Sequence, residues 1–228
     1  MRIVRTFGLA LFAAAALPAL AHAQATSLPP SKAARVFDDS WFWGVKGGST
    51  MFTTGEAGAS KVTAPTVGFE WLITRSHVAL NVSVEQAFFD NTASVFDATS
   101  TGSVRRVSIS DLRRYNASIF FFPVQYGALR PYAGLGLALN VIQSAQPQGT
   151  FSSSEAQSSV FTAVEQQSSR SSPVFTVGAQ AQVMRASLFA QVATMPTRNN
   201  FLINGGANTF MLEAGIRYNL LRAIDRLQ

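Results

Sequence analysis

The residues after Trp41 alternate between apolar and polar with a period of two, and this pattern limits the possible folds more than any other feature of the sequence. In the segment 78–85, valine and leucine occupy the even positions, and the odd positions hold Ala79, Asn81, Ser83 and Glu85. The segments 134–141 and 210–220 repeat the alternation. Because successive side chains of a β-strand point to opposite faces, the pattern predicts strands with one apolar and one polar face.

Eight segments carry this alternation, and we predict a strand for each: 41–53, 65–74, 78–90, 104–122, 130–143, 173–184, 187–195 and 208–220. Three of the connections are short turns, and the four that alternate with them are longer: 54–64, 91–103, 144–172 and 196–207. Five prolines fall at predicted strand ends or turns, where a missing ladder donor is tolerated: Pro65, Pro123, Pro131, Pro173 and Pro196. This organisation is typical of an all-β, eight-stranded antiparallel up-and-down transmembrane β-barrel.

The longest connection, residues 144–172, is dense in serine and glutamine and has few aliphatic residues. A segment of this composition buries too little apolar surface to offset the entropy that is lost when its backbone is ordered. We therefore expect this connection to be mobile and exposed.

Residues 1–23 have the three parts of a secretory signal peptide: a basic start, an apolar run from Phe7 to Leu20, and the small-residue site Ala21-His22-Ala23. The apolar run is shorter than the roughly 20 residues that span a bilayer as a helix. We therefore predict cleavage after Ala23, which leaves Gln24 as the first residue of the exported chain. An uncleaved membrane anchor is the alternative.

The mature chain divides into three parts. Residues 24–40 contain Pro29-Pro30, which cannot continue a helix or a ladder, and we expect a flexible periplasmic lead-in there. Residues 41–220 form the predicted barrel, and residues 221–228 remain as a C-terminal tail.

The composition excludes several classes of partner and cofactor. The chain has no cysteine, so disulfides cannot stabilise it in the oxidising compartment to which the leader sends it. Its formal charge is +6, and its basic residues are dispersed rather than gathered in a stripe, which argues against nucleic acid as a partner. With no cysteine and one histidine after the leader, and no calcium-loop spacing of carboxylates, we predict no metal and no cofactor.

Alternation alone does not reveal which solvent the apolar face meets, because soluble barrels turn that face inward. The polar parity here is rich in small residues and amides and poor in lysine and glutamate, which suits a tight interior better than a surface exposed to water. Aromatic residues gather near strand ends, where we predict a girdle at one membrane boundary: Trp41, Phe42, Trp43, Phe120, Phe121, Phe122, Tyr126, Tyr132 and Tyr218. Both features favour a membrane barrel.

Two motifs carry a resemblance to a known family. The spacing of Glu213, Gly215, Tyr218 and Leu220 resembles the terminal-strand signal read by the bacterial barrel-assembly machinery, and the segment 130–136 (RPYAGLG) resembles a strand opening common in the same family. Residues 41–220 are thus similar to the OmpA/OmpX-like outer-membrane β-barrel domains. The resemblance implies an eight-stranded barrel with its loops outside the cell, and it implies little about chemistry. The chain departs from the family pattern because it continues beyond the last strand.

The polar parity directs six charged residues towards the lumen: Lys46, Glu70, Glu85, Arg114, Glu213 and Arg217. An eight-stranded barrel is only wide enough for side chains to fill it. Buried charges must then pair, because an unpaired one costs several kcal/mol. We therefore expect a polar network that plugs the barrel, with a narrow channel for small solutes or ions as the alternative.

We predict a non-enzymatic, monomeric outer-membrane protein with a structural or surface-display role, whose partners are outer-membrane lipid and, during biogenesis, the barrel-assembly machinery. A lipid-modifying enzyme built on His77, Ser83 and Glu85 is one alternative. At the usual rise per residue, however, the serine and the glutamate would lie roughly 20 to 27 Å along the strand from the histidine, so we predict no catalytic residue. A soluble ligand-binding barrel is the remaining alternative.

Overall fold

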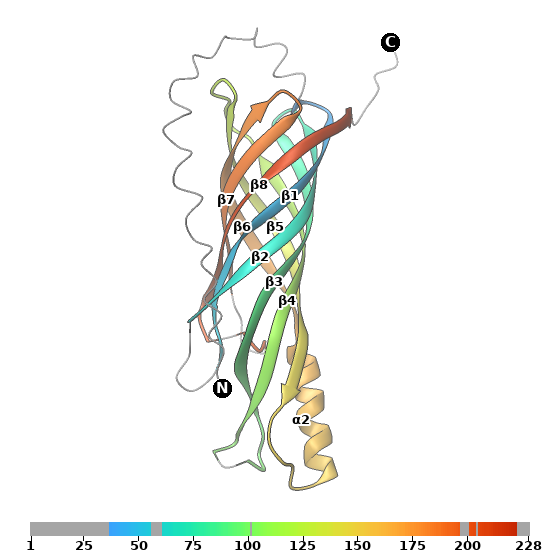
Figure 1. The fold of residues 1–228 in the computed structure, drawn as a ribbon, viewed down its shortest axis with the longest axis vertical. Helices are drawn as coiled ribbons and strands as arrows, with labels where there is room; N and C mark the ends of the chain where they lie inside the picture. Colours follow the sequence, from blue (N-terminus) through green and yellow to red (C-terminus); the bar gives the residue numbers. More distant parts are fainter. Residues whose placement is uncertain (1–36, 56–60, 101, 197–200, 204, 223–228) are drawn as a thin grey trace, which may run out of the picture.

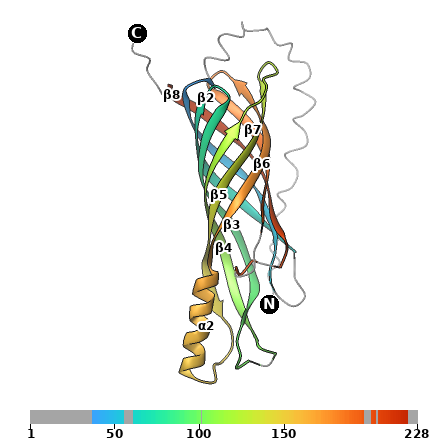
Figure 2. The ribbon, with the colours of Figure 1, turned by 180° about the vertical axis from the view of Figure 1, so that it is seen from behind.

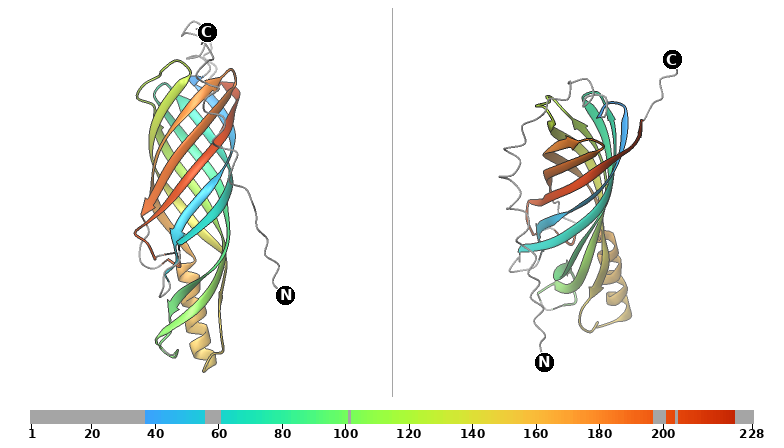
Figure 3. Two further views of the ribbon diagram at one scale, coloured as in Figure 1. Left: turned by 60° about the vertical axis from the view of Figure 1, so that its left-hand side comes forward. Right: turned by 45° about the horizontal axis from the view of Figure 1, so that its top comes forward.

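The computed structural model describes residues 37–55, 61–100, 102–196, 201–203 and 205–222. Its strands form one closed antiparallel barrel, in which each strand pairs with the next and β8 pairs with β1 (Figures 1 and 3). The strands are β1 (Ser40–Thr53), β2 (Lys61–Arg75), β3 (Val78–Phe96), β4 (Val104–Phe121), β5 (Leu129–Pro147), β6 (Ser169–Val183), β7 (Ala186–Pro196) and β8 (Asn208–Arg222). The eight-stranded up-and-down barrel predicted from the alternation is confirmed.

The polar parity of the strands faces the interior, and the apolar parity forms the outer wall. In β3, Leu80 is exposed while Asn81 and Glu85 are buried. In β8, Leu212 is exposed while Glu213 is buried. The outer wall is therefore apolar and the middle of the interior polar, which is the reverse of a soluble barrel.

Several strands are longer than the alternation predicts. β2 begins at Lys61 and β6 at Ser169, in each case four residues before the predicted start. Pro65, which was expected at a strand end, therefore lies inside β2. It stands one residue outside the ladder between β2 and β3, which begins at Thr66, and proline is tolerated at such an edge.

The predicted leader, residues 1–23, lies outside the described residues, and only residues 37–40 of the lead-in are described. Ser40 pairs with Arg222, so both ends of the described chain leave the barrel at one rim. The short β2–β3, β4–β5 and β6–β7 connections lie at this rim, which we call the turn rim (Figure 1). Among the described residues, no helix has the length and apolar character that a membrane span requires.

Three neighbouring strands continue beyond the opposite rim, which we call the arm rim (Figures 1 and 2). With one helix they form a projection that we call the arm, residues 88–100, 102–111 and 142–168. β3 pairs with β2 only as far as Ala87, but with β4 as far as Phe96. Asp111 has a φ of 56° where the buried positions along β4 change from odd to even. This irregularity lets one apolar face run from the lumen into the arm.

The connection between β5 and β6 contains the helix α2 (Ser154–Gln167), so the expectation that residues 144–172 do not fold is wrong, although most of the helix is exposed as expected. Ser153 caps the helix, because its Oγ accepts a hydrogen bond from Ala156 N at 3.1 Å. Three aliphatic residues at a spacing of four are buried on the face of α2 that meets the strands: Ala156, Val160 and Val164. So short an apolar stripe is enough to hold α2 in place, because β3 and β5 supply the other side of this apolar contact.

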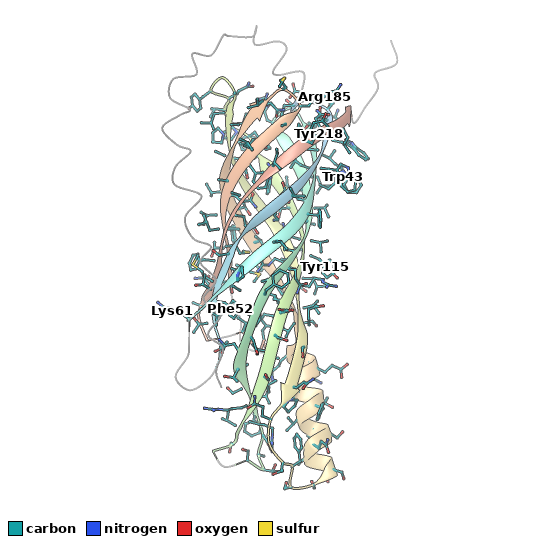
Figure 4. All side chains as sticks on the ribbon, in the orientation of Figure 1. Trp43, Phe52, Lys61, Tyr115, Arg185 and Tyr218 are labelled. Carbon is teal, nitrogen blue, oxygen red and sulfur yellow. The ribbon has the colours of Figure 1, made fainter. Side chains whose placement is uncertain are left out.

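Aromatic residues near the turn rim divide between the two faces of the wall, so the predicted girdle is only half right. One set faces outward, and Figure 4 labels two of its members: Trp41, Trp43, Phe121, Tyr126 and Tyr218. The other set is buried inside the barrel: Phe42, Phe120, Phe122 and Tyr132. The strand period explains the division, because Phe42 lies between two outward tryptophans and must point inward.

Replacing Val160 with aspartate should undock α2 without opening the barrel. A carboxylate in this apolar contact costs on the order of 2 kcal/mol, which raises the population of the undocked helix about thirtyfold. Thermolysin cleavage within α2, followed by mass spectrometry, should accelerate by a similar factor. Ser158→Asp on the exposed face of α2 is the matched control. Equal cleavage rates for the two variants would contradict the packing described above.

Candidate functional site

A network of buried charged side chains fills the middle of the barrel. Lys46 of β1 lies at its centre, with Nζ 2.5 Å from Glu85 Oε1 and 3.0 Å from Glu213 Oε2. Arg114 of β4 donates from Nη1 to Glu85 Oε2 at 2.7 Å, and Ser83 Oγ donates to Glu85 Oε1 at 2.9 Å. Every charge of this cluster therefore faces an opposite charge, as near-complete burial requires.

A second ion pair joins β2 to β8. Arg217 donates from Nε to Glu70 Oε1 and from Nη1 to Gln180 Oε1, the latter at 2.7 Å. Asn81 Nδ2 donates to the other oxygen of Glu70 at 3.4 Å. The guanidinium carbon of Arg217 lies 3.8 Å from the centroid of the Phe189 ring, which adds a cation–π contact. Both charged side chains of the pair are 0% exposed, so neither can exchange its partner for water.

Tyr132 and Gln191 connect the two clusters. Tyr132 Oη donates to Gln191 Oε1 at 2.7 Å, and Gln191 Nε2 donates to Glu213 Oε2 at 2.6 Å. The guanidinium carbon of Arg217 lies 5.7 Å from the centroid of the Tyr132 ring. The network therefore takes a side chain from every strand, and it brings together the six charged residues that the polar parity directed inward: Lys46, Glu70, Glu85, Arg114, Glu213 and Arg217.

The residues of the terminal-strand spacing lie on both faces of β8. Glu213 and Gly215 face the lumen, while Tyr218 and Leu220 face outward. A Cβ atom at Gly215 would lie 2.8 Å from the ring of Phe189, so close packing inside the barrel already requires a glycine at this position. That the barrel-assembly machinery recognises these four residues stays a prediction.

A buried aromatic cluster closes the lumen at the turn rim. Phe37, which precedes β1, packs against Phe42 and Phe122 with ring centroids 6.2 and 4.9 Å away. Its carbonyl oxygen accepts a hydrogen bond from Thr74 Oγ1, and the guanidinium carbon of Arg130 lies 3.9 Å from its ring centroid. Phe37 was not among the predicted site residues, because it stands in the segment expected to be a flexible lead-in. The inward aromatics could have been recognised from their parity.

A larger apolar cluster closes the lumen at the arm rim. It combines Phe52 and Leu112 from the strands and Val160 from α2 with three residues of the β7–β8 connection, Phe201, Leu202 and Ile203. Leu202 N donates to Gln167 O at 3.1 Å, which ties this connection to α2. The interior is thus apolar at both rims and charged in the middle. Such a filling suits a sealed plug rather than a conduit for water or ions.

In the described part of the chain, the candidate catalytic residues are not assembled. His77 lies in the exposed β2–β3 turn, with Nδ1 2.9 Å from Ser76 Oγ. Ser83 instead donates to Glu85, whose carboxylate is already held by Lys46. Among the described residues, no group of three or more histidine, cysteine, aspartate or glutamate side chains is placed to hold a metal ion.

The tip of the arm is organised around Arg105. Its Nε donates to Asp97 Oδ2 at 2.6 Å, and its Nη1 donates to Thr150 O at 3.2 Å. The guanidinium carbon also lies 4.2 Å from the centroid of the Phe151 ring, so Arg105 ties the β3–β4 turn to the segment before α2. Hydrogen bonds from the Thr99 side chain and from Arg105 hold the pKa of the Asp97 carboxyl below its ordinary value.

No protein-family model matches this chain, and no curated protein matches it by sequence. Among solved structures, Neisserial surface protein A has the same fold, with a TM-score of 0.51 at 12% identity over 79% of this chain and 97% of its own. The N-terminal β-barrel domain of Pseudomonas aeruginosa OprF matches at a TM-score of 0.45 and 13% identity, over 80% of this chain and 98% of its own. Ail of Yersinia pestis matches at 0.41 and 12%, over 79% and 99%. The likeness to the neisserial barrel shows a shared fold, as the resemblance to OmpA/OmpX-like domains implied.

Replacing Glu70 with alanine leaves the Arg217 guanidinium buried without its carboxylate. Removing one partner of a buried pair typically costs about 3 to 5 kcal/mol, and we expect the free energy of unfolding to fall by that amount. Urea unfolding in detergent micelles, followed by tryptophan fluorescence, measures the change. The double variant Glu70→Leu/Arg217→Met leaves no unpaired charge and should recover most of the loss. Single and double variants of equal stability would contradict this account of the lumen.

Protonation of Asp97 should loosen the tip of the arm. Because the pKa of Asp97 is lowered in the folded protein, its contribution to stability is present above the ordinary aspartate pKa and is lost as the pH falls through the lowered value. NMR resonances of Thr99 and Arg105, recorded from about pH 6 down to about pH 2, should move together with that midpoint. Asp97→Asn should abolish the transition, and a transition that persists in this variant would assign it to another carboxyl group.

Proposed function

We propose that this protein is a non-enzymatic outer-membrane β-barrel that holds the arm at the cell surface for a structural or surface-contact role. The observation that carries the proposal is a barrel with a lumen filled by side chains and an apolar outer wall, which in the described part of the chain continues at one rim into a folded arm. The name of Neisserial surface protein A, which shares the fold, agrees with a place at the surface.

The outer wall supports a place in lipid. Each strand contributes at least one large apolar side chain that is exposed by more than two fifths: Val45, Phe69, Leu80, Ile119, Leu137, Val177, Val192 and Leu212. A soluble protein rarely exposes so large a continuous apolar surface, because contact with water is unfavourable in proportion to its area. The outward tryptophans and tyrosines near the turn rim suit the interface between acyl chains and headgroups.

The two rims differ in a way that supports one orientation. Outer-membrane barrels have short turns on the periplasmic side and longer connections outside the cell. The turn rim and both ends of the described chain would then lie in the periplasm, and the arm would lie outside. The secretory leader predicted for residues 1–23 agrees with export across the inner membrane.

The filling of the lumen favours a structural role over the two alternatives that keep the barrel in a membrane. An ion channel needs a continuous polar path, whereas apolar clusters stand at both rims of this barrel. A lipid hydrolase needs a nucleophile, a base and an acid in contact, and His77 lies in a turn beside Ser76. We also propose that the protein works as a monomer in contact with membrane lipid, and that the barrel-assembly machinery inserts it.

Because the chain has no cysteine, single introduced cysteines can report the orientation of the barrel. We expect Ser158→Cys, on the exposed face of α2, to react with a membrane-impermeant maleimide in intact cells that express the full precursor. Met184→Cys, in the β6–β7 turn, should react only after the outer membrane is permeabilised. Met184 is 82% exposed, so burial cannot account for protection from the reagent.

The same cells supply the controls for membrane insertion. The protein should fractionate with the outer membrane, migrate faster on a gel before boiling than after, and begin at Gln24 by mass. Labelling of Met184→Cys alone would reverse the orientation. A periplasmic protein without a change in mobility would overturn the membrane assignment and favour a soluble ligand-binding barrel.

A further inference from the structure

The outer wall carries a groove across β1 to β4, with a volume of about 710 Å³. Its lining is mainly apolar and comes from outward side chains that are each more than two fifths exposed: Val45, Val67, Phe69, Val84 and Phe88. Gly47 pairs with Val67 and has no side chain to fill the trough beside it. The groove is therefore an apolar depression on the outer wall.

A polar pair lines the groove on its arm side, with Phe88 and Asp111 beyond it on the same two strands. Gln86 and Arg113 are register partners on β3 and β4, and Arg113 Nε donates to Gln86 Oε1 at 3.1 Å. In the described part of the chain, neither Nη group of Arg113 and no hydrogen of the Gln86 amide has a protein acceptor. These donors lie together at the mouth of the groove. The outward positions of β4 nearer the turn rim, such as Tyr115 and Ile119, are apolar or aromatic, so Arg113 marks the edge of the apolar belt.

The position of Arg113 restricts what can occupy the groove. An arginine on the lipid-facing wall costs about 2 to 4 kcal/mol at the bilayer midplane and little near the interface, so this end of the groove lies at headgroup depth. The planar fork of a guanidinium matches the oxygens of a phosphate group, and Gln86 adds a further donor. The apolar trough continues from this fork towards the bilayer centre, as an acyl chain does from its headgroup.

We infer that the groove binds a phosphorylated membrane lipid, with the phosphate on Arg113 and Gln86 and an acyl chain along Val67 and Phe69. The inference rests on the proposed function, because it needs the outer wall to lie in a bilayer. Asp111 also lines the groove. Its Oδ1 accepts a hydrogen bond from Phe89 N at 3.3 Å, and among the described residues no ion pair joins its carboxylate to Arg113, so the guanidinium keeps donors for a phosphate.

Native mass spectrometry of the mature barrel in detergent tests the inference with two probes that share their acyl chains, dioleoyl phosphatidic acid and dioleoylglycerol. We expect the barrel to retain the phosphatidic acid about tenfold better than the diglyceride, as a charge-assisted bidentate contact would give. Arg113→Gln should remove that preference. Arg106→Gln is the matched control, because it removes the same charge from an exposed position of the same strand outside the groove. Val67→Trp should fill the trough and lower retention of both lipids.

Equal retention of the two probes, or an unchanged preference in Arg113→Gln, would overturn the inference. Equal losses in Arg113→Gln and Arg106→Gln would also overturn it, because net charge rather than the groove would then decide binding. The mobility of unboiled protein separates this result from a failure of the proposed function. A barrel that folds but retains no phosphorylated lipid rejects only the groove, whereas a chain that does not form a heat-modifiable barrel rejects the proposed function itself.

Discussion

The pairing of β1 with β8 is the interaction on which the rest of the structure depends. In hydrocarbon, each unpaired backbone N–H or C=O group costs several kcal/mol, so a sheet can cross a bilayer only when it has no open edge. The ladder between these strands removes the edge, and it also brings Lys46 to Glu213 across 167 residues of sequence. Closure thus satisfies the backbone and assembles the charges that fill the interior.

The filled interior gives the wall and the arm a common support. Ion pairs in the middle and apolar clusters at both rims give the wall a dense core to which all eight strands contribute. The arm extends that core outward, because Val160 of α2 and Leu112 of β4 belong to the same cluster. The barrel therefore holds the surface of the arm in place. The exposed residues of the arm lie outside this cluster, so substitutions there should leave the barrel wall folded.

Local sequence patterns were sufficient to predict the strands and the face of the wall to which each of their side chains points. Leu80 and Asn81 alternate in sequence, and they lie on opposite faces in the structure. The same parity would have shown Phe42 to be internal, but aromatic composition near a strand end was interpreted as a girdle. The helix α2 was missed for a different reason, because its composition lacks a broad apolar face and its stability comes from the neighbouring strands.

By itself, the sequence determined that this chain forms strands with one apolar and one polar face, and which charged residues point to the polar side. The period of two is a property of consecutive residues, so no distant partner is needed to recognise it. That Lys46 meets Glu85 and Glu213, that Arg217 meets Glu70 and that Phe37 packs at one rim became clear only from the folded barrel. Those contacts depend on the register and closure of the sheet, which join residues far apart in the chain through hydrogen bonds that no local pattern specifies.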